Sequence, residues 1–336
     1  MCYALSLTFT SVALTLAVVF VNGLTDAPNA ISTVTVTRCM KLKWALVMSA
    51  IFNFIGAVVM SAVNNSVTAT IAGIVSFGDD SYSATVALSA ALFSIALWAV
   101  VAWCFGIPTS ESHALIAGLS GSAIAINGGL AGINFYEWLK AIKGLFTSCL
   151  LGLVAGFLMC RLVITVFRNI KRKYADSFFT LGQIFAAAGM SFMHGAQDGQ
   201  KFIAVLMLCM SFSDFNMAYA NWKIILLCSV TMALGTMCGG KKIIKAVGMD
   251  MVRLEKYQGF SADISASVVL LVSTLAGYPV STTHAKTTAM MGAGLAKGVK
   301  GINPLVIKDI ALTWLLTFPG CGIIGFVVTK IFLGVF

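Results

Sequence analysis

The chain has 336 residues, of which 59% are hydrophobic and 10% are charged, whereas a soluble domain has roughly 25% charged residues. This composition excludes an ordinary water-soluble protein and indicates a multi-pass membrane protein. The formal net charge of +10 would suggest a nucleic-acid partner in a soluble chain, but here the basic residues lie in short loops between apolar segments, so we predict no nucleic-acid binding.

Apolar segments close to the roughly 20 residues that cross a bilayer recur along the chain. The first is predicted to be a retained span and not a cleaved signal peptide, because no basic residue precedes it and no small-residue cleavage site follows it. The nine cysteines have no CxxC or metal-like spacing, so we interpret them as packing residues. The predicted apolar segments are Leu5 to Val21, Trp44 to Val63, Ala84 to Phe105, Gly144 to Phe167, Ile224 to Cys238 and Val306 to Phe332.

Basic residues gather in three segments, which the positive-inside rule places in the cytoplasm. The loops "SFGDDSYS" and "SFSDFNMAYAN" contain aspartates but no Lys or Arg, and we predict that they lie outside. The basic residues of the three segments are Arg38, Lys41 and Lys43; Arg168, Lys171, Arg172 and Lys173; and Lys241, Lys242, Lys245, Arg253 and Lys256.

Two motifs occur twice at nearly the same separation. "NGLTDAPNAI" (22–31) aligns with "HGAQDGQKFI" (194–203) at an offset of 172, and "GIPTSESHA" (106–114) aligns with "GYPVSTTHA" (277–285) at an offset of 171. We therefore predict transmembrane repeats over 1–170 and 176–336, joined by a basic cytoplasmic linker over 171–175. The charge pattern predicts that the repeats have inverted topology, an architecture typical of secondary transporters that bind substrate near the midplane.

The first motif places an aspartate inside an apolar segment of each repeat. Asp26 and Asp198 are costly at membrane depth and therefore predict a functional site. Gly23 and Pro28, with Gly195 and Gly199 in the second repeat, are predicted to loosen the helix and free backbone carbonyls. Carboxylate, amide and carbonyl oxygens together favour a hard cation such as sodium, or a proton.

The two copies of this motif differ at seven positions, and three of these differences bear directly on the chemistry. Asn22 aligns with His194, Thr25 with Gln197, and Asn29 with Lys201. His194 is a candidate for carrying a coupling proton or a structural hydrogen-bonder. The amides of Asn29, Gln197 and Gln200 can donate to an oxyanion. Lys201 either neutralises Asp198, attracts an anion, or extends to the interface with its charge in water.

The second motif predicts two helical hairpins with an anion site at their tips. We favour re-entrant hairpins over broken spans because glycine and proline occupy the bend. Pro108 and Pro279 remove a donor at a helix start, and the hydroxyls that follow cap the free amides, so each half-helix would point N–H groups inward. The hydroxyl residues are Ser110, Ser112, Ser281, Thr282 and Thr283.

His113 and His284 follow these hydroxyls, but adjacent helical residues point about 100° apart, so Ser112 and His113 cannot form an activated nucleophile. We predict no enzyme, and expect both histidines to hydrogen-bond across the hairpin in a structural role. Glu111 has no counterpart in the second repeat, where Thr282 stands. A carboxylate there must be protonated, paired with Lys201 or Lys286, or bound to a cation.

At these four motifs the chain resembles the inorganic phosphate transporter family, often called PiT, in its short bacterial form. "NGLTDAPNAIST" and "HGAQDGQK" resemble the family's Asp motifs, and "PTSESHALIAG" and "PVSTTHAKTTA" resemble its Pro-Ser-Thr-His motifs. The resemblance covers effectively the whole chain. It implies an all-helical polytopic fold of two inverted repeats with broken helices and helical hairpins, and a secondary symporter that holds phosphate between hairpin tips and Asp segments.

Two departures bear on the coupling ion. The family more often has Asn-Asp where this chain has Gln197-Asp198, and Ser or Thr where it has Glu111. The predicted phosphate-binding residues are Asn29, Ser110, Ser112, Gln200, Lys201, Ser281, Thr282 and Thr283. The predicted residues for the coupling cation or proton are Asp26, Asp198, Asn22, Gln197, Glu111 and His194, with sodium, if bound, at Asp26 and Asp198. The predicted structural residues of the hairpins are Pro108, His113, Pro279 and His284.

The leading hypothesis is a symporter of a prokaryotic plasma membrane that imports inorganic phosphate, free or as a metal–phosphate complex, with sodium or protons by alternating access. A sulfate or other oxyanion permease of the same fold is the alternative, and an anion channel fits the asymmetric pairs poorly. No cofactor is predicted beyond the coupling ion. The expected partners are phosphate and the lipid bilayer, and the resemblance is compatible with a homodimer.

Overall fold

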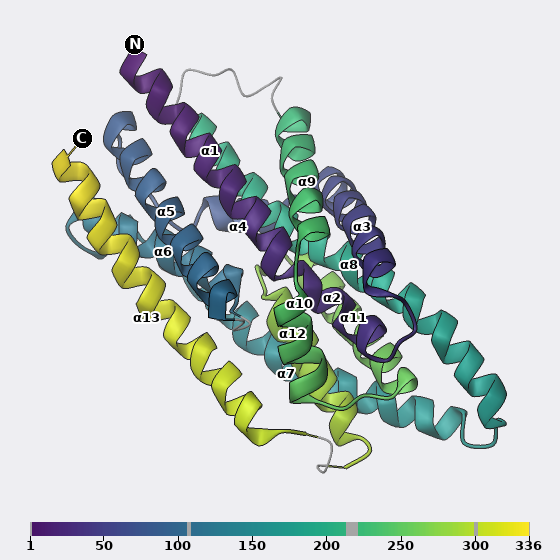
Figure 1. Cartoon of the computed structure of the whole chain (residues 1–336). Helices are drawn as coiled ribbons and strands as arrows, with labels where there is room; N and C mark the ends of the chain where they lie inside the picture. Colours follow the sequence, from purple (N-terminus) through teal and green to yellow (C-terminus); the bar gives the residue numbers. More distant parts are fainter. Residues whose placement is uncertain (1, 106–108, 213–220, 299–301, 336) are drawn as a thin grey trace.

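The structure is a computed structural model that describes residues 2–105, 109–212, 221–298 and 302–335, and Pro108 lies outside these ranges. Within them the chain forms helices and no strand, apart from isolated bridges at Val75–Ile133 and Val252–Ile302. Both termini lie at the same end of an elongated bundle (Figure 1). The predicted all-helical fold is confirmed.

The first half of the chain forms seven α-helices and one 3₁₀ turn in its described part. They are α1 (Cys2–Thr25), α2 (Ala27–Val36), α3 (Leu42–Val63), α4 (Ser66–Ala72), α5 (Ser81–Phe105), α6 (Glu111–Asn127), the 3₁₀ turn η1 (Leu130–Gly132) and α7 (Phe135–Val166).

The second half begins with a helix of 40 residues, α8 (Arg172–Ser211). The remaining elements are α9 (Asn221–Cys238), α10 (Lys241–Lys245), the π-helical turn η3 (Ala246–Met251), α11 (Lys256–Leu275), α12 (Thr282–Leu295) and α13 (Pro304–Val335). Six helices in the described part of the chain are long and apolar enough to cross a bilayer. There are seven if α9 and the segment Ile243–Met249, bent by 73° at their junction, form one span.

The prediction that both Asp motifs break their helices is right for one repeat and wrong for the other. The helical hydrogen-bond pattern is interrupted at Asp26, because Pro28 in the first turn of α2 has no N–H to continue the hydrogen bonds of α1, although α1 and α2 together form one candidate span. α8 runs unbroken through Gly195 and Gly199. The position that aligns with Pro28 holds Gln200, whose backbone N–H can continue the helix.

α5 packs on α6, and α11 packs on α12, so each second motif joins two helices in contact, as hairpins require. Each hairpin lies at the centre of an apolar cluster. Leu92 and Leu115 belong to the first cluster, and Leu270 and Met290 to the second. α7, α8 and α13 each contribute residues to both clusters and therefore connect them.

The outer faces of the bundle expose large apolar side chains, as a lipid-facing surface requires. Phe146 and Leu150 on α7 and Leu315 and Ile323 on α13 are all more than half exposed. α7 and α13 place small residues on their buried faces, such as Gly156 and Gly325. An added Cβ on Gly156 would meet the Ala289 carbonyl, so α7 and α12 are in close backbone contact.

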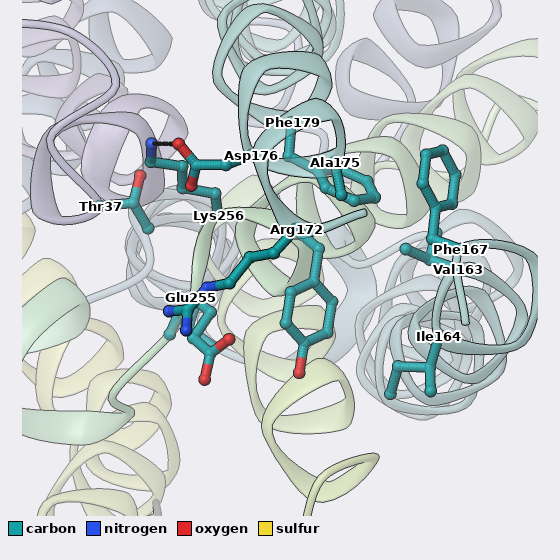
Figure 2. A pocket seen from close by; sticks show the side chains of 12 residues that line it. Thr37, Val163, Ile164, Phe167, Arg172, Ala175, Asp176, Phe179, Glu255 and Lys256 are labelled. Atoms are coloured by element: carbon teal, nitrogen blue, oxygen red, sulfur yellow. Dashed lines mark hydrogen bonds and ion pairs between the residues drawn. The ribbon is translucent and has the colours of Figure 1, made fainter. Parts of the chain in front are cut away.

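The basic segments meet at one end of the molecule. A cavity of about 480 Å³ there is lined by Arg172 and Lys256 of the second and third segments and by Thr37, which directly precedes Arg38 of the first (Figure 2). Lys256 donates to Asp176 across this cavity at 2.7 Å. This gathering supports the predicted common orientation of the three loops, whereas the inverted relation of the repeats stays a prediction.

Candidate functional site

The tips of the two hairpins meet inside the protein. Ser110 is the N-cap of α6 and accepts from the His113 N–H at 3.3 Å, and Ser281 is the N-cap of α12 and accepts from the His284 N–H at 3.2 Å. The Ser110 hydroxyl donates to the Ser281 hydroxyl at 2.9 Å. Two helix N-termini, each with free backbone amides, therefore lie against one another, and their positive ends suit an anion.

Lys201 is held by three oxygens between α8 and the hairpin tips. Its Nζ donates to Asp198 Oδ1 at 2.6 Å, to the Ser112 hydroxyl at 2.6 Å and to the Val280 carbonyl at 2.5 Å. The side chain is 1% exposed, so it does not extend to the membrane surface. Of the three predicted roles of Lys201, the structure fits neutralisation of Asp198. The ammonium group also lies at the hairpin tips, where it could attract an anion.

Asp198 accepts from residues of two further helices in addition to Lys201, and a histidine ring nitrogen lies close to it. Asn22 of α1 reaches its Oδ2 at 3.4 Å, Thr282 of α12 donates to Oδ2 at 3.1 Å, and His194 Nε2, one turn earlier on α8, lies 3.3 Å from Oδ2. Each carboxylate oxygen therefore has a partner. Asp198 joins both repeats at the centre of the molecule.

Asp26 and Glu111 are less well satisfied. Asn22 Nδ2 lies 3.4 Å from Asp26 Oδ2, and Thr25 donates to Glu111 Oε1 at 2.9 Å. Glu111 pairs with neither lysine, because Lys201 bonds to Asp198 and Lys286 bonds to Asp263. Two of the predicted alternatives remain for Glu111, which are protonation and cation binding.

Several buried polar atoms have no hydrogen-bond partner among the described residues, and both side-chain amide atoms of Gln200 on α8 are among them. Three more are oxygens of the first repeat, which are Asn22 Oδ1, Asn29 Oδ1 and Glu111 Oε2. Burying such atoms without a partner is costly. Because Asn22 bonds to Asp26, Asn29 to Thr283 and Glu111 to Thr25, the three oxygens indicate a place near Asp26 where a ligand or ion completes the bonding.

Gln197 and His194 each connect α8 to another helix. Gln197 accepts from the Thr274 hydroxyl and donates to the Tyr278 carbonyl at 2.9 Å, which ties α8 to the end of α11. His194 Nδ1 lies 3.0 Å from Asn53 Oδ1 on α3. Both residues position α8, and His194 alone keeps its other ring nitrogen near Asp198.

The expected hydrogen bonds of His113 and His284 across the hairpin are replaced by ring packing between the two hairpins. The rings meet edge to face with centroids 4.3 Å apart, and His284 also stacks at 3.6 Å from the Trp314 ring of α13. The His284 Nδ1 contact is with Cys149 on α7 at 3.4 Å. Each histidine follows its N-cap serine by three residues, and Pro279 precedes the second N-cap by two.

The sequence reasoning missed a second buried charge cluster. Lys286 of α12 bonds to Asp263 of α11, and Thr33 of α2 donates to both Asp263 oxygens at 2.9 and 2.8 Å. Lys286 is one helical turn beyond Thr282, and Thr33 is one turn beyond Asn29, which itself donates to Thr283 at 3.1 Å. Asp263 was missed because it lies outside both repeated motifs. The sequence does contain a signal for it, since Asp263 is an aspartate within the largely apolar segment "FSADISASVVLLV", and the same feature identified Asp26.

Residues 22–325 match the phosphate transporter family. The chain belongs to this family. It is 32% identical to a "Probable low-affinity inorganic phosphate transporter" of Bacillus subtilis (strain 168), over 96% of each chain, and 33% identical to a protein of the same name from Rhizobium meliloti (strain 1021), over 91% of this chain and 90% of the relative.

Among solved structures, "The sodium-dependent phosphate transporter" aligns with a TM-score of 0.86 over 98% of this chain and 100% of its own, at 21% identity. At that identity the likeness shows the fold alone. The family and these relatives are transporters and not enzymes, and this chain is a multi-pass membrane protein of the same family.

Proposed function

We propose that this chain is a secondary symporter that imports inorganic phosphate across the prokaryotic plasma membrane, coupled to sodium or protons, by alternating access. The membership of the phosphate transporter family and the names of the relatives support the substrate class. The observation that carries the proposal is the meeting of two capped helix N-termini at Ser110 and Ser281 beside a buried lysine.

Phosphate is proposed to enter between the hairpin tips. The hydroxyls of Ser110 and Ser281 and the amides behind them donate to the anion without charge, so the anion can be released again. Lys201 supplies one positive charge, and the side-chain amide of Gln200, which has no partner within the described ranges, supplies a further donor. Ser112, Thr282 and Thr283 already bond at these tips and can exchange partners for phosphate oxygens.

The coupling ion is proposed to bind at Asp26 and Glu111. Both are buried, and neither is paired with a lysine or arginine in the described part of the chain. Two such carboxylates are stable beside a phosphate anion only when protons or cations accompany it. Asn22 Oδ1 and Asn29 Oδ1, both unpartnered, are additional oxygen ligands of the kind that sodium prefers.

The test is uptake of labelled phosphate by proteoliposomes that contain the purified protein, with sodium and proton gradients imposed separately. We expect accumulation under at least one gradient and none in protein-free vesicles. Sulfate, arsenate and a divalent metal are added in separate runs. Stronger uptake of sulfate than of phosphate would favour an oxyanion permease, currents without saturation or coupling would favour a channel, and dependence on the metal would indicate a metal–phosphate complex.

A further inference from the structure

The two Asp motifs contact the hairpin tip of the opposite repeat at equivalent positions, but through different functional groups. When positions are paired at the repeat offsets, Asn29 corresponds to Lys201 and Thr283 corresponds to Ser112. Asn29 Nδ2 donates to Thr283 Oγ1 at 3.1 Å, and Lys201 Nζ donates to Ser112 Oγ at 2.6 Å. The same cross-repeat contact is therefore made by a neutral amide in one repeat and by an ammonium group in the other.

The aspartates also correspond. Asn22 Nδ2 lies 3.4 Å from Asp26 Oδ2, and His194 Nε2 lies 3.3 Å from Asp198 Oδ2, in each case one helical turn before the aspartate. The two halves of the site therefore differ mainly in where a positive charge is built in. The Asp198 half has Lys201 at 2.6 Å, and in the Asp26 half the equivalent position is the uncharged Asn29.

The surroundings of Lys201 Nζ are those of a hard-cation site. A carboxylate, a hydroxyl and a main-chain carbonyl lie 2.5 to 2.6 Å from the ammonium nitrogen, and these are the oxygen types that bind sodium or calcium in proteins. In the other half, the third carboxylate of the region, Glu111, stands where the second repeat has Thr282. Unpartnered oxygens of Asn22, Asn29 and Glu111 remain there.

We propose that Lys201 is a tethered cation that permanently fills the second of two repeat-equivalent cation sites, so that only the site at Asp26 and Glu111 takes its ion from solution. The inference rests on the proposed function. Lys201 neutralises Asp198 in every step of the cycle, but it cannot leave and therefore contributes no coupling energy. The chain thus moves one fewer cation per phosphate than it would with a neutral residue at 201.

The experiment measures the cation-to-phosphate ratio of wild-type proteoliposomes and of Lys201→Asn, which introduces the residue of the first repeat. The phosphate gradient is fixed, and the gradient of whichever ion drives wild-type uptake is varied until net flux stops. We expect the ratio to rise by one in Lys201→Asn. At a potential of about 100 mV, one more coupled charge corresponds to roughly 50-fold greater phosphate accumulation. Lys201→Arg keeps the charge and should keep the ratio.

Two further variants allow the test to be made even if Lys201→Asn does not fold. Lys201→Gln replaces Lys201→Asn if the latter does not reach the membrane. Asn29→Lys adds a tethered cation to the first repeat and should lower the cation-to-phosphate ratio by one. An unchanged ratio in an active Lys201→Asn or Lys201→Gln would overturn the inference. Folded, membrane-inserted neutral variants that stay inactive at every sodium concentration and pH would also overturn it. Failure of the wild type itself to take up phosphate would instead reject the proposed function.

Discussion

Glu111 is the residue whose environment the structure clarifies most. It is the first residue of α6, almost fully buried, and its one hydrogen bond within the described chain is from Thr25, directly before Asp26. A carboxylate at a helix N-terminus is favoured by the helix dipole, but a phosphate site has no use for a second negative charge. We therefore group Glu111 with Asp26 in the proposed cation site.

At the same scale, Asp26→Asn and Asp198→Asn should fail for different reasons. Asp26 forms no ion pair with a lysine or arginine in the described structure, so its neutralisation should abolish phosphate uptake and leave the free energy of unfolding nearly unchanged. Asp198→Asn leaves Lys201 buried without its carboxylate, which should lower that free energy by about 3–5 kcal/mol as well as uptake. Thermal unfolding in detergent, beside uptake measurements, checks this contrast. Equal stability of the two variants, or normal uptake by Asp26→Asn, would contradict it.

At the scale of elements, the contact among α2, α11 and α12 differs from its counterpart in the first repeat. Thr33, Asp263 and Lys286 form a charged cluster, whereas the positions paired with them at the repeat offsets hold Val205, Leu92 and Leu115. Val205, Leu92 and Leu115 are fully buried in one apolar cluster. The same helix junction is therefore packed with hydrocarbon in one half and with an ion pair in the other.

This difference predicts a non-additive response to substitution. Asp263→Leu or Lys286→Met alone leaves one buried charge unpaired and should cost about 3–5 kcal/mol of stability, whereas the double variant should lie near the wild type or above it. Unfolding midpoints of the four proteins in detergent, treated as a double-mutant cycle, give the coupling. Leu92→Met is the matched control in the other half. Additive losses would show that the two side chains do not act as a pair.

At the scale of the whole molecule, the site is assembled from both halves of the chain. Ser110 meets Ser281, Asn29 meets Thr283, and Lys201 meets Ser112, so each contact joins residues more than 80 positions apart in sequence. Entry of phosphate between the tips requires the Ser110–Ser281 contact to open. Glycines keep the supporting helices in close backbone contact, since a Cβ at Gly195 would lie 2.0 Å from the Asn53 carbonyl.

A disulfide across the tips should therefore stop transport. In an active background without the nine native cysteines, Ser110→Cys with Ser281→Cys places two thiols where two hydroxyl oxygens now lie 2.9 Å apart. We expect phosphate uptake to fall by at least about tenfold on oxidation and to recover on reduction, whereas each single cysteine variant should not respond to oxidant. Full uptake by the cross-linked protein, with the disulfide verified by mass spectrometry, would show that the tips stay together during transport.

The sequence by itself determined the helical membrane fold, the two hairpin starts and the central position of Asp26 and Asp198, because length, apolarity, proline and N-cap residues act locally or recur at a fixed offset. It could not decide that α8 is unbroken, that the two histidine rings pack on each other instead of hydrogen-bonding across the hairpin, or that Glu111 has no lysine partner. Those outcomes depend on which distant side chains meet. Lys201 and Asp198 lie one turn apart on α8, so their pairing was among the alternatives that the sequence offered, and burial of the lysine among the helices decided for it. The pairing of Lys286 with Asp263 joins two helices and was decided by the fold alone.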